Sequence, residues 1–551
     1  MEDYYEQLSL FEEEMIEKKI TKPVRLISFF SGIEAQYKAL SYLAEILQIP
    51  VESYKTCEWA YNSIIACNAI HNRDFTNYSE GKTKEEMIER IRGISVNYNE
   101  PLSDEQLNKK PLKWIQNAYN SCIANHNLIN IMDVHASDLE IIDNSEHEYI
   151  VTYSYPCQDL SLAGKRAGMA VSQAEGGTRS GLLWEVERII TECRDLGYEH
   201  MPNILVMENV PQVHSEKDLP QFRKWLQKLE ELGYTNYWKD LNSKNYGIPQ
   251  NRERTFMVSI LRSKDGTEYN YRFPVGFKRK YVLNDFIEPK VDERFYLSKK
   301  MINYLTGVNQ KESKYDRGSV FERNLNPNKD IAATITTAAG QRATDNFILE
   351  PVEEDDQTQI DLKRGYSISV KNESAEPVDG VEVIGNYSKS NFSQTPIIGK
   401  NGIAPTFTEN HGQVAAIAIR EATIQGYKEA HVGDGVNISA RMKHQRGNVQ
   451  EGMSQTLKTT CEVGVVVQEG KEVRLRIRKI TPKEAMRLMS FQDIDADRMY
   501  EIGLTDSAIF HCAGDSIVVC VLIGIFAKLF GLNNKEIETV INDYVERIKQ
   551  C

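Results

Sequence analysis

Two continuous apolar runs, EYIVTYS at 148–154 and NILVMENV at 203–210, constrain the fold more than any other feature of this sequence. Continuous apolar strands of this length are typical of a parallel sheet whose two faces are both covered by helices. The sequence therefore predicts an α/β protein that is built on a doubly wound sheet.

The rest of the first half alternates between strand-like and helix-like segments, as a chain of βαβ units does. Segments 24–30 and 52–59 are predicted strands, each followed by a predicted helix, at 32–47 and 61–71. The segments YTNYWKDLNS and RTFMVSIL predict a hairpin at the edge of the sheet. Ligands of such sheets bind at the carboxyl ends of the strands, so functional side chains are expected there.

Changes in composition predict four segments of the chain. They are an acidic N-terminal helix (1–21), the α/β segment (22–275) with a charged insertion at about 76–130, a Thr/Gly/Asn-rich segment of short β-like runs (276–475), and a helical C-terminal segment (476–551). Within the last segment, Thr481 is a predicted helix N-cap, followed by Pro482 at the first helical position and by Glu484. The stretch CAGDSIVVCVLIGIFAKLF (512–530) is predicted to form a turn and then a buried helix.

Bulk properties indicate a soluble, cytoplasmic protein. The N-terminus does not resemble a signal peptide, and the longest apolar run, 516–530, is too short to span a bilayer. Nine cysteines with no CxxC pair and no zinc-type spacing predict reduced thiols and no metal site. The net charge of −13 disfavours nucleic acid as a partner, but residues 436–480 hold nine Lys/Arg against four Asp/Glu.

A repeated pattern occurs inside the Thr-rich segment. DIAATITTAAGQ (330–341), GIAPTFTENHGQ (402–413) and GMSQTLKTTCEV (452–463) share an apolar-small-x-Thr-apolar order, with Thr334, Thr406 and Thr456 at the common threonine. A strand-like segment follows each of them. The pattern indicates three repeat units, and the alternative is that Thr-rich strands resemble one another by chance.

Polar residues occupy several predicted strand ends. Cys157 follows one strand, Glu208 lies near the end of another, and Arg252 and Arg254 stand just before a third. Taken singly, Cys157 is explained as an inert buried cysteine and Glu208 as a carboxylate that caps a helix. The two arginines are explained as part of a solvated edge. A free thiol is only a few per cent thiolate at neutral pH, and nearby arginines would favour the thiolate. Together the four residues predict an active site.

Eight short motifs, in order, resemble those of the DNA cytosine-5 methyltransferases of bacteria and phages. The motifs are FFSGIEAQ (29–36), CEW (57–59), ASDL (136–139), PCQDLSLAGKR (156–166), ENV (208–210), QNRER (250–254), ITPKEAMRLMSF (480–491) and AGDSIVV (513–519). The resemblance implies a fold in which a methyltransferase sheet carries a smaller, mostly β, target-recognition domain at 276–475, and in which 476–551 completes the catalytic domain.

The resemblance also implies the chemistry. Cys157 adds to carbon 6 of a cytosine that is flipped out of the duplex, which lets carbon 5 take a methyl group from S-adenosylmethionine. Glu208 holds or protonates ring nitrogen 3, and Arg254 donates to the carbonyl oxygen of the base. Arg252 helps to polarise the site and the thiol. No metal is implied.

By the same resemblance, a set of residues binds the cofactor: Phe30, Gly32, Glu58, Trp59, Asp138, Leu139, Pro156, Leu183, Asp515 and Ile517. Glu58 accepts the ribose hydroxyls, Trp59 stacks on adenine and Asp138 bonds the adenine amino group. Two residues depart from the commonest family pattern. Glu34 resembles a phage-type variant and Asp515 replaces an asparagine, so each is expected to add a carboxylate near a cationic cofactor.

Double-stranded DNA is the implied partner, contacted by Gln158, Ser161, Ala163, Gln250 and the three repeat threonines. The three repeat units form either one composite reading surface, which we favour slightly, or alternative recognition units for different target sequences. The chain is expected to act as a monomer, away from membranes, and a restriction endonuclease partner would be a separate chain.

Other functions remain open. The same chemistry acts on RNA in some relatives of this fold, although the long Thr/Gly-rich segment favours DNA. A catalytically silent DNA-binding relative is disfavoured by the four intact site residues. A thymidylate-synthase-like enzyme also uses a Pro-Cys pair on a pyrimidine, but it needs neither CEW nor ASDL. Adenine methylation is disfavoured because no Asn/Asp-Pro-Pro-aromatic loop occurs.

Overall fold

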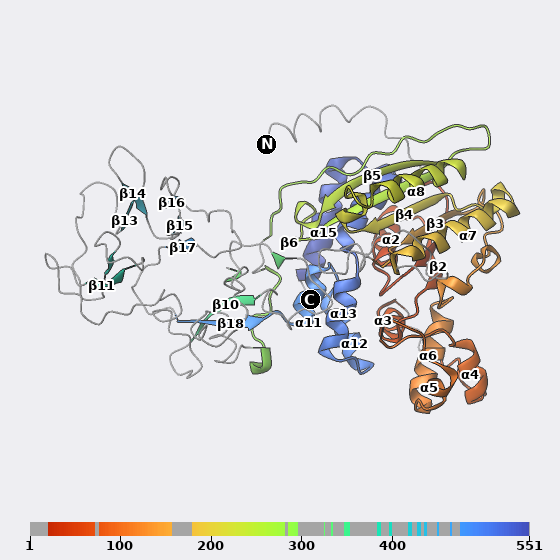
Figure 1. The fold of residues 1–551 in the computed structure, drawn as a ribbon, viewed down its shortest axis with the longest axis horizontal. Helices are drawn as coiled ribbons and strands as arrows, with labels where there is room; N and C mark the ends of the chain where they lie inside the picture. Colours follow the sequence, from red (N-terminus) through yellow and green to blue (C-terminus); the bar gives the residue numbers. More distant parts are fainter. Residues whose placement is uncertain are drawn as a thin grey trace. The chain divides into compact units, whose positions relative to one another are not determined.

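The structure is a computed structural model that describes residues 20–71, 76–97, 99–156, 179–281, 285–295 and 480–549, and the short strands between 324 and 479. The chain divides into two compact units (Figure 1). Unit 1 comprises Met1–Val291, Asn326–Ala339 and Ile480–Cys551, and unit 2 comprises Asp292–Leu325 and Gly340–Lys479.

Unit 1 is built on a six-stranded mixed sheet in the order β2-β1-β3-β4-β7-β5. The strands are β1 (Val24–Phe29), β2 (Val51–Cys57), β3 (Glu148–Tyr153), β4 (Ile204–Asn209), β5 (Tyr234–Asn242) and β7 (Glu253–Leu261). The first four are parallel, and β7 runs antiparallel to both β4 and β5. The predicted α/β sheet and its edge hairpin are confirmed.

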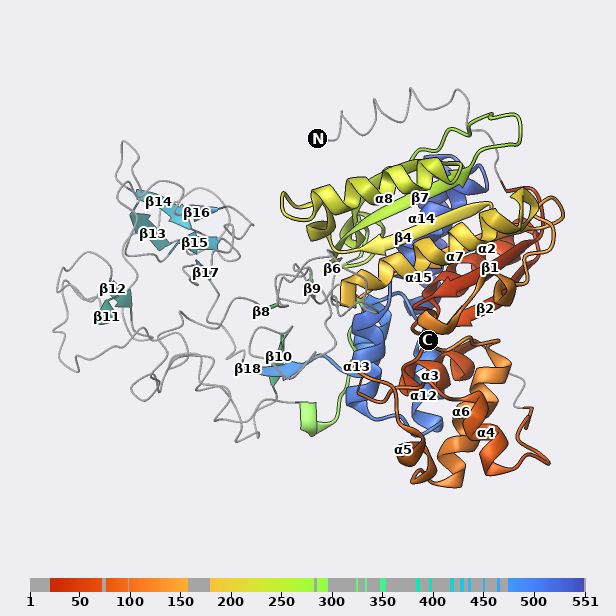
Figure 2. The same cartoon turned by 45° about the vertical axis from the view of Figure 1, so that its right-hand side comes forward.

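Helices cover both faces of this sheet. Figure 2 shows α7 (Leu183–Leu196) and α8 (Leu219–Glu231) in front of the strands, and α2 (Ala35–Leu47) and α14 (Val519–Leu529) behind them. Every residue of β3 and β4 is buried, which explains why their sequences are continuously apolar. In α8 the buried residues Phe222, Trp225 and Leu229 recur at helical spacing, so one stripe of that helix packs against the sheet.

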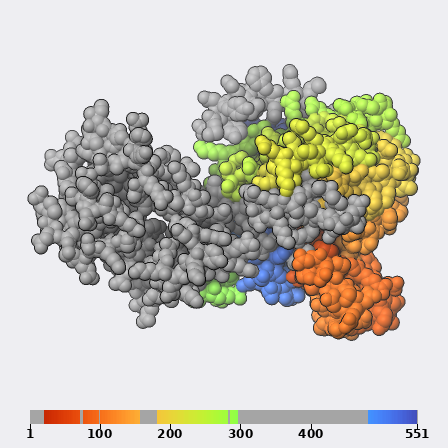
Figure 3. All heavy atoms as spheres, viewed as in Figure 1, coloured from red at the N-terminus to blue at the C-terminus, as the bar shows by residue number. Residues whose placement is uncertain are grey.

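The predicted insertion forms a small helical lobe, which projects from the unit in orange in Figure 3. It contains α4 (Lys84–Arg90), α5 (Asp104–Asn108) and α6 (Leu112–Ala124), and it follows α3 (Tyr61–His71). Capping boxes begin α4 at Thr83 and α5 at Ser103. The lobe has a hydrophobic core of its own, so it is a packed element of the structure.

The C-terminal segment contributes five helices to unit 1: α11 (Pro482–Leu488), α12 (Asp493–Glu501), α13 (Asp506–Asp515), α14 and α15 (Asn534–Lys549). The predicted capping box at Thr481 and Glu484 is present. The turn and buried helix predicted within 512–530 are the break at 516–518 and α14, and Cys512–Asp515 belong to the last turn of α13. Among the described residues, only Asp506–Leu529 is long and apolar enough to cross a membrane, and it is mostly buried, as a core helix is.

The described parts of unit 2 are a short 3-10 helix, η9 (Glu293–Phe295), and a set of β-strands. β10 (Phe347–Val352) pairs with β18 (Arg474–Lys479) and β8 (Asn324–Leu325). The other pairings join β11 (Val383–Asn386) to β12 (Pro396–Ile398), β13 (Ile417–Arg420) to β14 (Tyr427–Ala430), and β15 (Gly435–Asn437) to β16 (Val449–Gln450) and β17 (Val463–Val465). The strands β10, β13 and β17 follow the three Thr segments, as the repeat pattern predicts. Thr334, Thr406 and Thr456 lie outside the described residues, and a recognition role for this region stays a prediction.

Candidate active site

The strand ends that carry the predicted site residues meet at one edge of the sheet. Phe29 at the end of β1 pairs with Cys57 of β2 and Tyr153 of β3, and Tyr153 in turn pairs with Met207 of β4. The antiparallel strand β7 begins at this edge, because its Thr255 pairs with Asn209. Residues that are far apart in sequence are therefore neighbours, as the parallel order predicts.

Glu208 and Arg254 form an ion pair at this edge. The Arg254 Nε atom lies 3.1 Å from Glu208 Oε1, and the two side chains are only 18% and 11% exposed. One guanidinium amino group of Arg254 also donates to the Glu253 carbonyl at 2.7 Å. The pair is shielded from bulk water, so the orientation of its carboxylate and guanidinium is well defined.

The Glu208 strand is tied directly to the residues that precede Cys157. The side-chain amide of Asn209 donates to the Tyr155 carbonyl at 3.1 Å. Pro156 is at this edge, whereas Cys157, Gln158, Ser161 and Ala163 lie outside the described residues. The nucleophile assigned from sequence thus follows a segment that is hydrogen-bonded to the carboxylate strand.

Arg252 is placed differently from Arg254. Its side chain is 5% exposed, and Nη2 donates to the carbonyls of Gly514 at 3.1 Å and Ser516 at 2.8 Å. These hydrogen bonds tie the start of β7 to the break between α13 and α14. The structure therefore gives Arg252 a joining role, and its expected action on the thiol stays a prediction.

Gln250, in β6 (Gln250–Asn251), joins this part of the chain to the end of α11. Its side chain is completely buried, and its amide donates to the Leu488 carbonyl at 2.7 Å. A buried amide cannot reach DNA, so the expected DNA contact is corrected to a contact within the protein. Its strand pairs with β9 (Ala332–Ala333) of the same unit. Sequence motifs do not reveal the hydrogen bond from Gln250 to Leu488, because the acceptor lies more than 200 positions away.

The loop after β1 and the carboxylate after β2 form one hydrogen-bonded unit. The Gly32 N–H donates to Glu58 Oε2 at 2.9 Å, and the Ala60 N–H donates to Oε1 at 2.8 Å. Phe30 and Gly32 both have left-handed backbones, with φ of 54° and 55°, which turns the loop toward Glu58. Burial raises the pKa of Glu58, and the charge of nearby Asp515 acts in the same direction. Asp515 therefore adds a negative charge near Glu58, and its expected position beside the cofactor stays a prediction.

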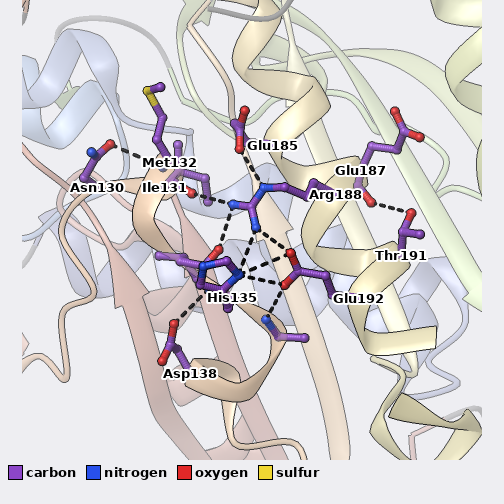
Figure 4. Close-up of polar contacts among 12 residues, drawn as sticks. Asn130, Ile131, Met132, His135, Asp138, Glu185, Glu187, Arg188, Thr191 and Glu192 are labelled. Carbon is purple, nitrogen blue, oxygen red and sulfur yellow. Dashed lines mark hydrogen bonds and ion pairs between the residues drawn. The ribbon is translucent and has the colours of Figure 1, made fainter. Parts of the chain in front are cut away.

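The turn that carries Asp138 is held by α7, as Figure 4 shows. Asp138 accepts the His135 N–H at 2.8 Å and so caps its own turn, η2 (Ala136–Leu139). Arg188 donates to the Val134 carbonyl at 2.7 Å, and Glu192 accepts the Ala136 N–H at 3.0 Å. The turn is fixed by a helix that begins shortly after the predicted nucleophile loop.

The remaining predicted cofactor residues differ in exposure. Phe30 and Trp59 are half-buried, and Ile517 is buried with a small exposed fraction. Leu139 and Leu183 have no exposed surface and belong to the main hydrophobic core. In this structure these two leucines pack in the core beside the sheet, and they do not line an open surface.

Glu34 does not present its charge on the cofactor loop, which corrects the expectation for this residue. It is 2% exposed, and its Oε1 accepts the hydroxyls of Ser53 at 2.6 Å and Ser28 at 3.3 Å. Its other oxygen lies 3.7 Å from the Cys67 sulfur. The side chain points into the protein because the residue stands in a left-handed conformation before α2.

Glu34, Cys67 and His71 together form a group of metal-ligating type within the described part of the chain. Their possible ligand atoms all lie within 4.8 Å of one another. Cysteine spacing alone could not reveal this group, because Glu34 reaches it from another element. The signal available in the sequence was the i, i+4 placement of Cys67 and His71 on one predicted helix.

The buried Glu34 predicts a pH-dependent stability. Burial raises its pKa from 4.5 to about 7, so the folded state keeps a proton that the unfolded state releases. Stability is therefore lost as the pH rises from 4.5 to 7. We expect the free energy of unfolding of Glu34→Gln to exceed that of wild type by about 3 kcal/mol at pH 8. At pH 5 the difference should be less than about 1 kcal/mol.

Urea unfolding of both proteins at the two pH values measures this difference. Glu52→Gln, which changes an exposed glutamate on the neighbouring strand, is the matched control and should show no comparable gain. An equal difference between Glu34→Gln and wild type at pH 5 and pH 8 would contradict the assignment.

Comparisons with known proteins bear on the family of this chain. The family model described as C-5 cytosine-specific DNA methylase matches residues 104–531. The orphan methyltransferase M.SssI of Spiroplasma monobiae is 34% identical over 309 residues, which cover 55% of this chain and 74% of that protein. The orphan methyltransferase M.SPRI of Bacillus phage SPR is 26% identical over 486 residues, which cover 81% and 96%.

A solved structure, that of the Entamoeba histolytica methyltransferase EhMeth, aligns with a TM-score of 0.47 at 12% identity. The alignment covers 93% of this chain and 98% of that chain.

Proposed function

Because this chain belongs to the family of C-5 cytosine-specific DNA methylases, we propose that it transfers a methyl group from S-adenosylmethionine to carbon 5 of a cytosine within a specific duplex DNA sequence. The observation that carries the proposal is the shielded Glu208–Arg254 pair, in which the strand of Glu208 is hydrogen-bonded to the residues just before Cys157. This is the arrangement that activation of a pyrimidine ring requires.

Carbon 5 of cytosine is a weak nucleophile, so the ring must first be activated. In the proposed mechanism the Cys157 thiolate forms a bond to carbon 6, the electron pair of the 5,6 double bond shifts to the 4,5 position, and the 3,4 pair moves onto nitrogen 3. Glu208 holds or protonates nitrogen 3, and Arg254 donates to the carbonyl oxygen, so both stabilise the charge that develops there. Carbon 5 can then take the methyl group, with S-adenosylhomocysteine as the product that departs. A base accepts the proton on carbon 5, the 5,6 double bond re-forms, and Cys157 leaves as a thiolate.

The target atom is inaccessible inside a stacked duplex, so the cytosine must rotate out of the helix, at a cost of a few kcal/mol. The partly buried Glu208–Arg254 pair suits this requirement, because a flipped base replaces water around both groups. An extrahelical base also brings its ring edge, with nitrogen 3 and the carbonyl oxygen, within reach of one carboxylate and one guanidinium.

The residues at the sheet edge fit S-adenosylmethionine, which supplies an electrophilic methyl group. Glu58 presents a carboxylate that is oriented by two backbone N–H groups, as binding of ribose hydroxyls requires. Asp138 stands in a turn fixed by α7, where it can accept from an adenine amino group. Phe30, Gly32, Trp59, Pro156, Asp515 and Ile517 complete the proposed cofactor surface.

Methyl transfer from labelled S-adenosylmethionine tests the proposed function directly. Duplex DNA of mixed sequence should gain label, and an oligonucleotide that carries 5-fluorocytosine in the target sequence should form a covalent protein adduct. A protein that labels transfer RNA and leaves DNA unlabelled has the alternative RNA activity. Absence of both label and adduct indicates a silent DNA-binding relative.

We propose further that residues 276–475 read the target sequence, as one composite surface of three units. Separate substitution of Thr334, Thr406 and Thr456 by valine should then weaken methylation at the same set of sites, because all three contribute to one surface. Bisulfite sequencing of DNA from cells that express each variant maps these sites. Loss of a different subset in each variant favours alternative recognition units.

The proposal places the enzyme in the cytoplasm, acting on double-stranded DNA as a monomer. Any restriction endonuclease that shares its target sequence would be a separate chain.

A further inference from the structure

We propose that Asn127, at the end of the inserted helical lobe, is a positioning residue that sets the affinity for S-adenosylmethionine by holding Glu58 in place. The inference rests on the proposed function, because it assigns to Glu58 the ribose hydroxyls of that cofactor. It gives the inserted segment between α3 and β3 a role in the cofactor site.

Asn127 holds the backbone of Glu58 at two points. Its Oδ1 atom accepts the Glu58 N–H at 3.0 Å, and its Nδ2 atom donates to the Glu58 carbonyl at 2.9 Å. The side chain thus takes the place of a neighbouring strand just after β2 ends. Two contacts to one residue fix the direction in which the Glu58 carboxylate leaves the backbone.

Asn127 is itself held so that its amide cannot turn away. The residue is 1% exposed, its Oδ1 also accepts the Ile129 N–H at 3.1 Å, and its own N–H donates to the Cys122 carbonyl at 2.8 Å. Arg90 of α4 donates to its carbonyl at 2.7 Å. Each of these partners belongs to the inserted segment, so the lobe positions the amide.

The same lobe supports the residues on either side of this contact. Ser95 donates its N–H to the Trp59 carbonyl at 2.7 Å and accepts the Tyr61 N–H at 2.9 Å. Trp114 of α6 stacks on Tyr61 with ring centroids 4.1 Å apart and an interplanar angle of 14°. Trp59 packs against the core of the lobe. The whole stretch from Glu58 to Tyr61 is therefore supported by the insertion.

A positioning role predicts a loss that is specific to the ribose. Both oxygens of Glu58 already accept backbone N–H groups, and a third and fourth acceptor direction can point to ribose hydroxyls only if the residue does not tilt. Without Asn127, the Glu58 peptide is free to tilt. The Glu58 carboxylate then keeps its charge but no longer points at the ribose hydroxyls. Cofactor binding is weakened, and the chemistry of Cys157 and Glu208 is unchanged.

The test uses the full chain and the variant Asn127→Leu, with calorimetric titration of S-adenosylhomocysteine. We expect the dissociation constant to rise about tenfold, as weakening of a hydrogen bond from a ligand hydroxyl to a charged carboxylate produces. The KM for S-adenosylmethionine should rise by a similar factor, with kcat at saturating cofactor and the KM for DNA unchanged. Asn120→Leu is the matched control, because this asparagine of the same lobe donates to Asn77. It should bind as wild type does.

A ligand variant separates positioning from general damage to the fold. The 2′,3′-dideoxy analogue of S-adenosylhomocysteine lacks the hydroxyls that Glu58 accepts, so wild type and Asn127→Leu should bind it equally. Asn127→Asp, which keeps size and one acceptor, should show a loss of the same kind. A variant that loses affinity equally for both ligands, or loses kcat with unchanged affinity, overturns the proposal. Failure of wild type to bind S-adenosylhomocysteine overturns the proposed function instead.

Discussion

Replacement of Cys157 by alanine should abolish methyl transfer and leave cofactor and DNA binding intact. Without a nucleophile at carbon 6, carbon 5 keeps its aromatic character, and removal of an essential nucleophile costs on the order of 10⁴-fold or more in kcat. Transfer of labelled methyl groups to duplex DNA measures the loss. Band-shift and calorimetric titrations show whether the binding of both ligands persists.

Another cysteine of the chain supplies the control. Cys193 of α7 is buried, and burial raises the pKa of its thiol to about 12, so it is not a thiolate at neutral pH. Cys512 and Cys520 are buried in the same way, with pKa values raised to about 12. Cys193→Ala should therefore keep near-normal kcat, although it removes a sulfur from the core. Measurable turnover by Cys157→Ala would show that the assigned nucleophile is wrong.

Substitution of either member of the Glu208–Arg254 pair should lower kcat by about 10²–10³-fold, because each stabilises charge that appears only as the ring is activated. We expect Glu208→Gln and Arg254→Leu to have similar effects. The double variant should lose much less than the product of the two single losses, since each partner also orients the other. Single-turnover rates at saturating DNA and cofactor provide the measurement.

Arg262→Leu is the matched control for Arg254→Leu. Arg262 follows the same strand, but its guanidinium donates to the Glu230 carbonyl on the outside of the molecule. Its replacement should leave the single-turnover rate unchanged. Independent, multiplying losses in the double variant of Glu208 and Arg254 would mean that the two residues act on separate steps.

Much of the fold was predictable, because its strands carry a strong local signal. The runs at 148–154 and 203–210 are continuously apolar, and the structure buries every residue of β3 and β4. Because β7 runs antiparallel to β4, the start of β7 lies beside the carboxyl end of β4, so the closeness of Glu208 and Arg254 follows from order and direction. The capping box at Thr481 is equally local, since its partners lie within one turn.

The sequence could not show which side chains form hydrogen bonds with residues that are distant along the chain. Gln250 and Arg252 belong to one short motif with Arg254, yet their partners are carbonyls at Leu488, Gly514 and Ser516. No local pattern marks a backbone carbonyl as an acceptor. Glu34 was misjudged for a related reason, because its direction depends on a left-handed backbone that a glutamate adopts only when its surroundings impose it.

The contacts of Gln250 and Arg252 have an evolutionary consequence. They join the chain before residue 291 to the chain after residue 480, and both joined parts belong to unit 1. The hydrogen bonds therefore hold together the two ends of the intervening stretch of chain. The segments of unit 2 within that stretch can then change in length while the parts of unit 1 that these hydrogen bonds join keep their register. On the proposal that residues 276–475 read the target sequence, changes in that region would alter the specificity and leave Glu208 and Arg254 in place.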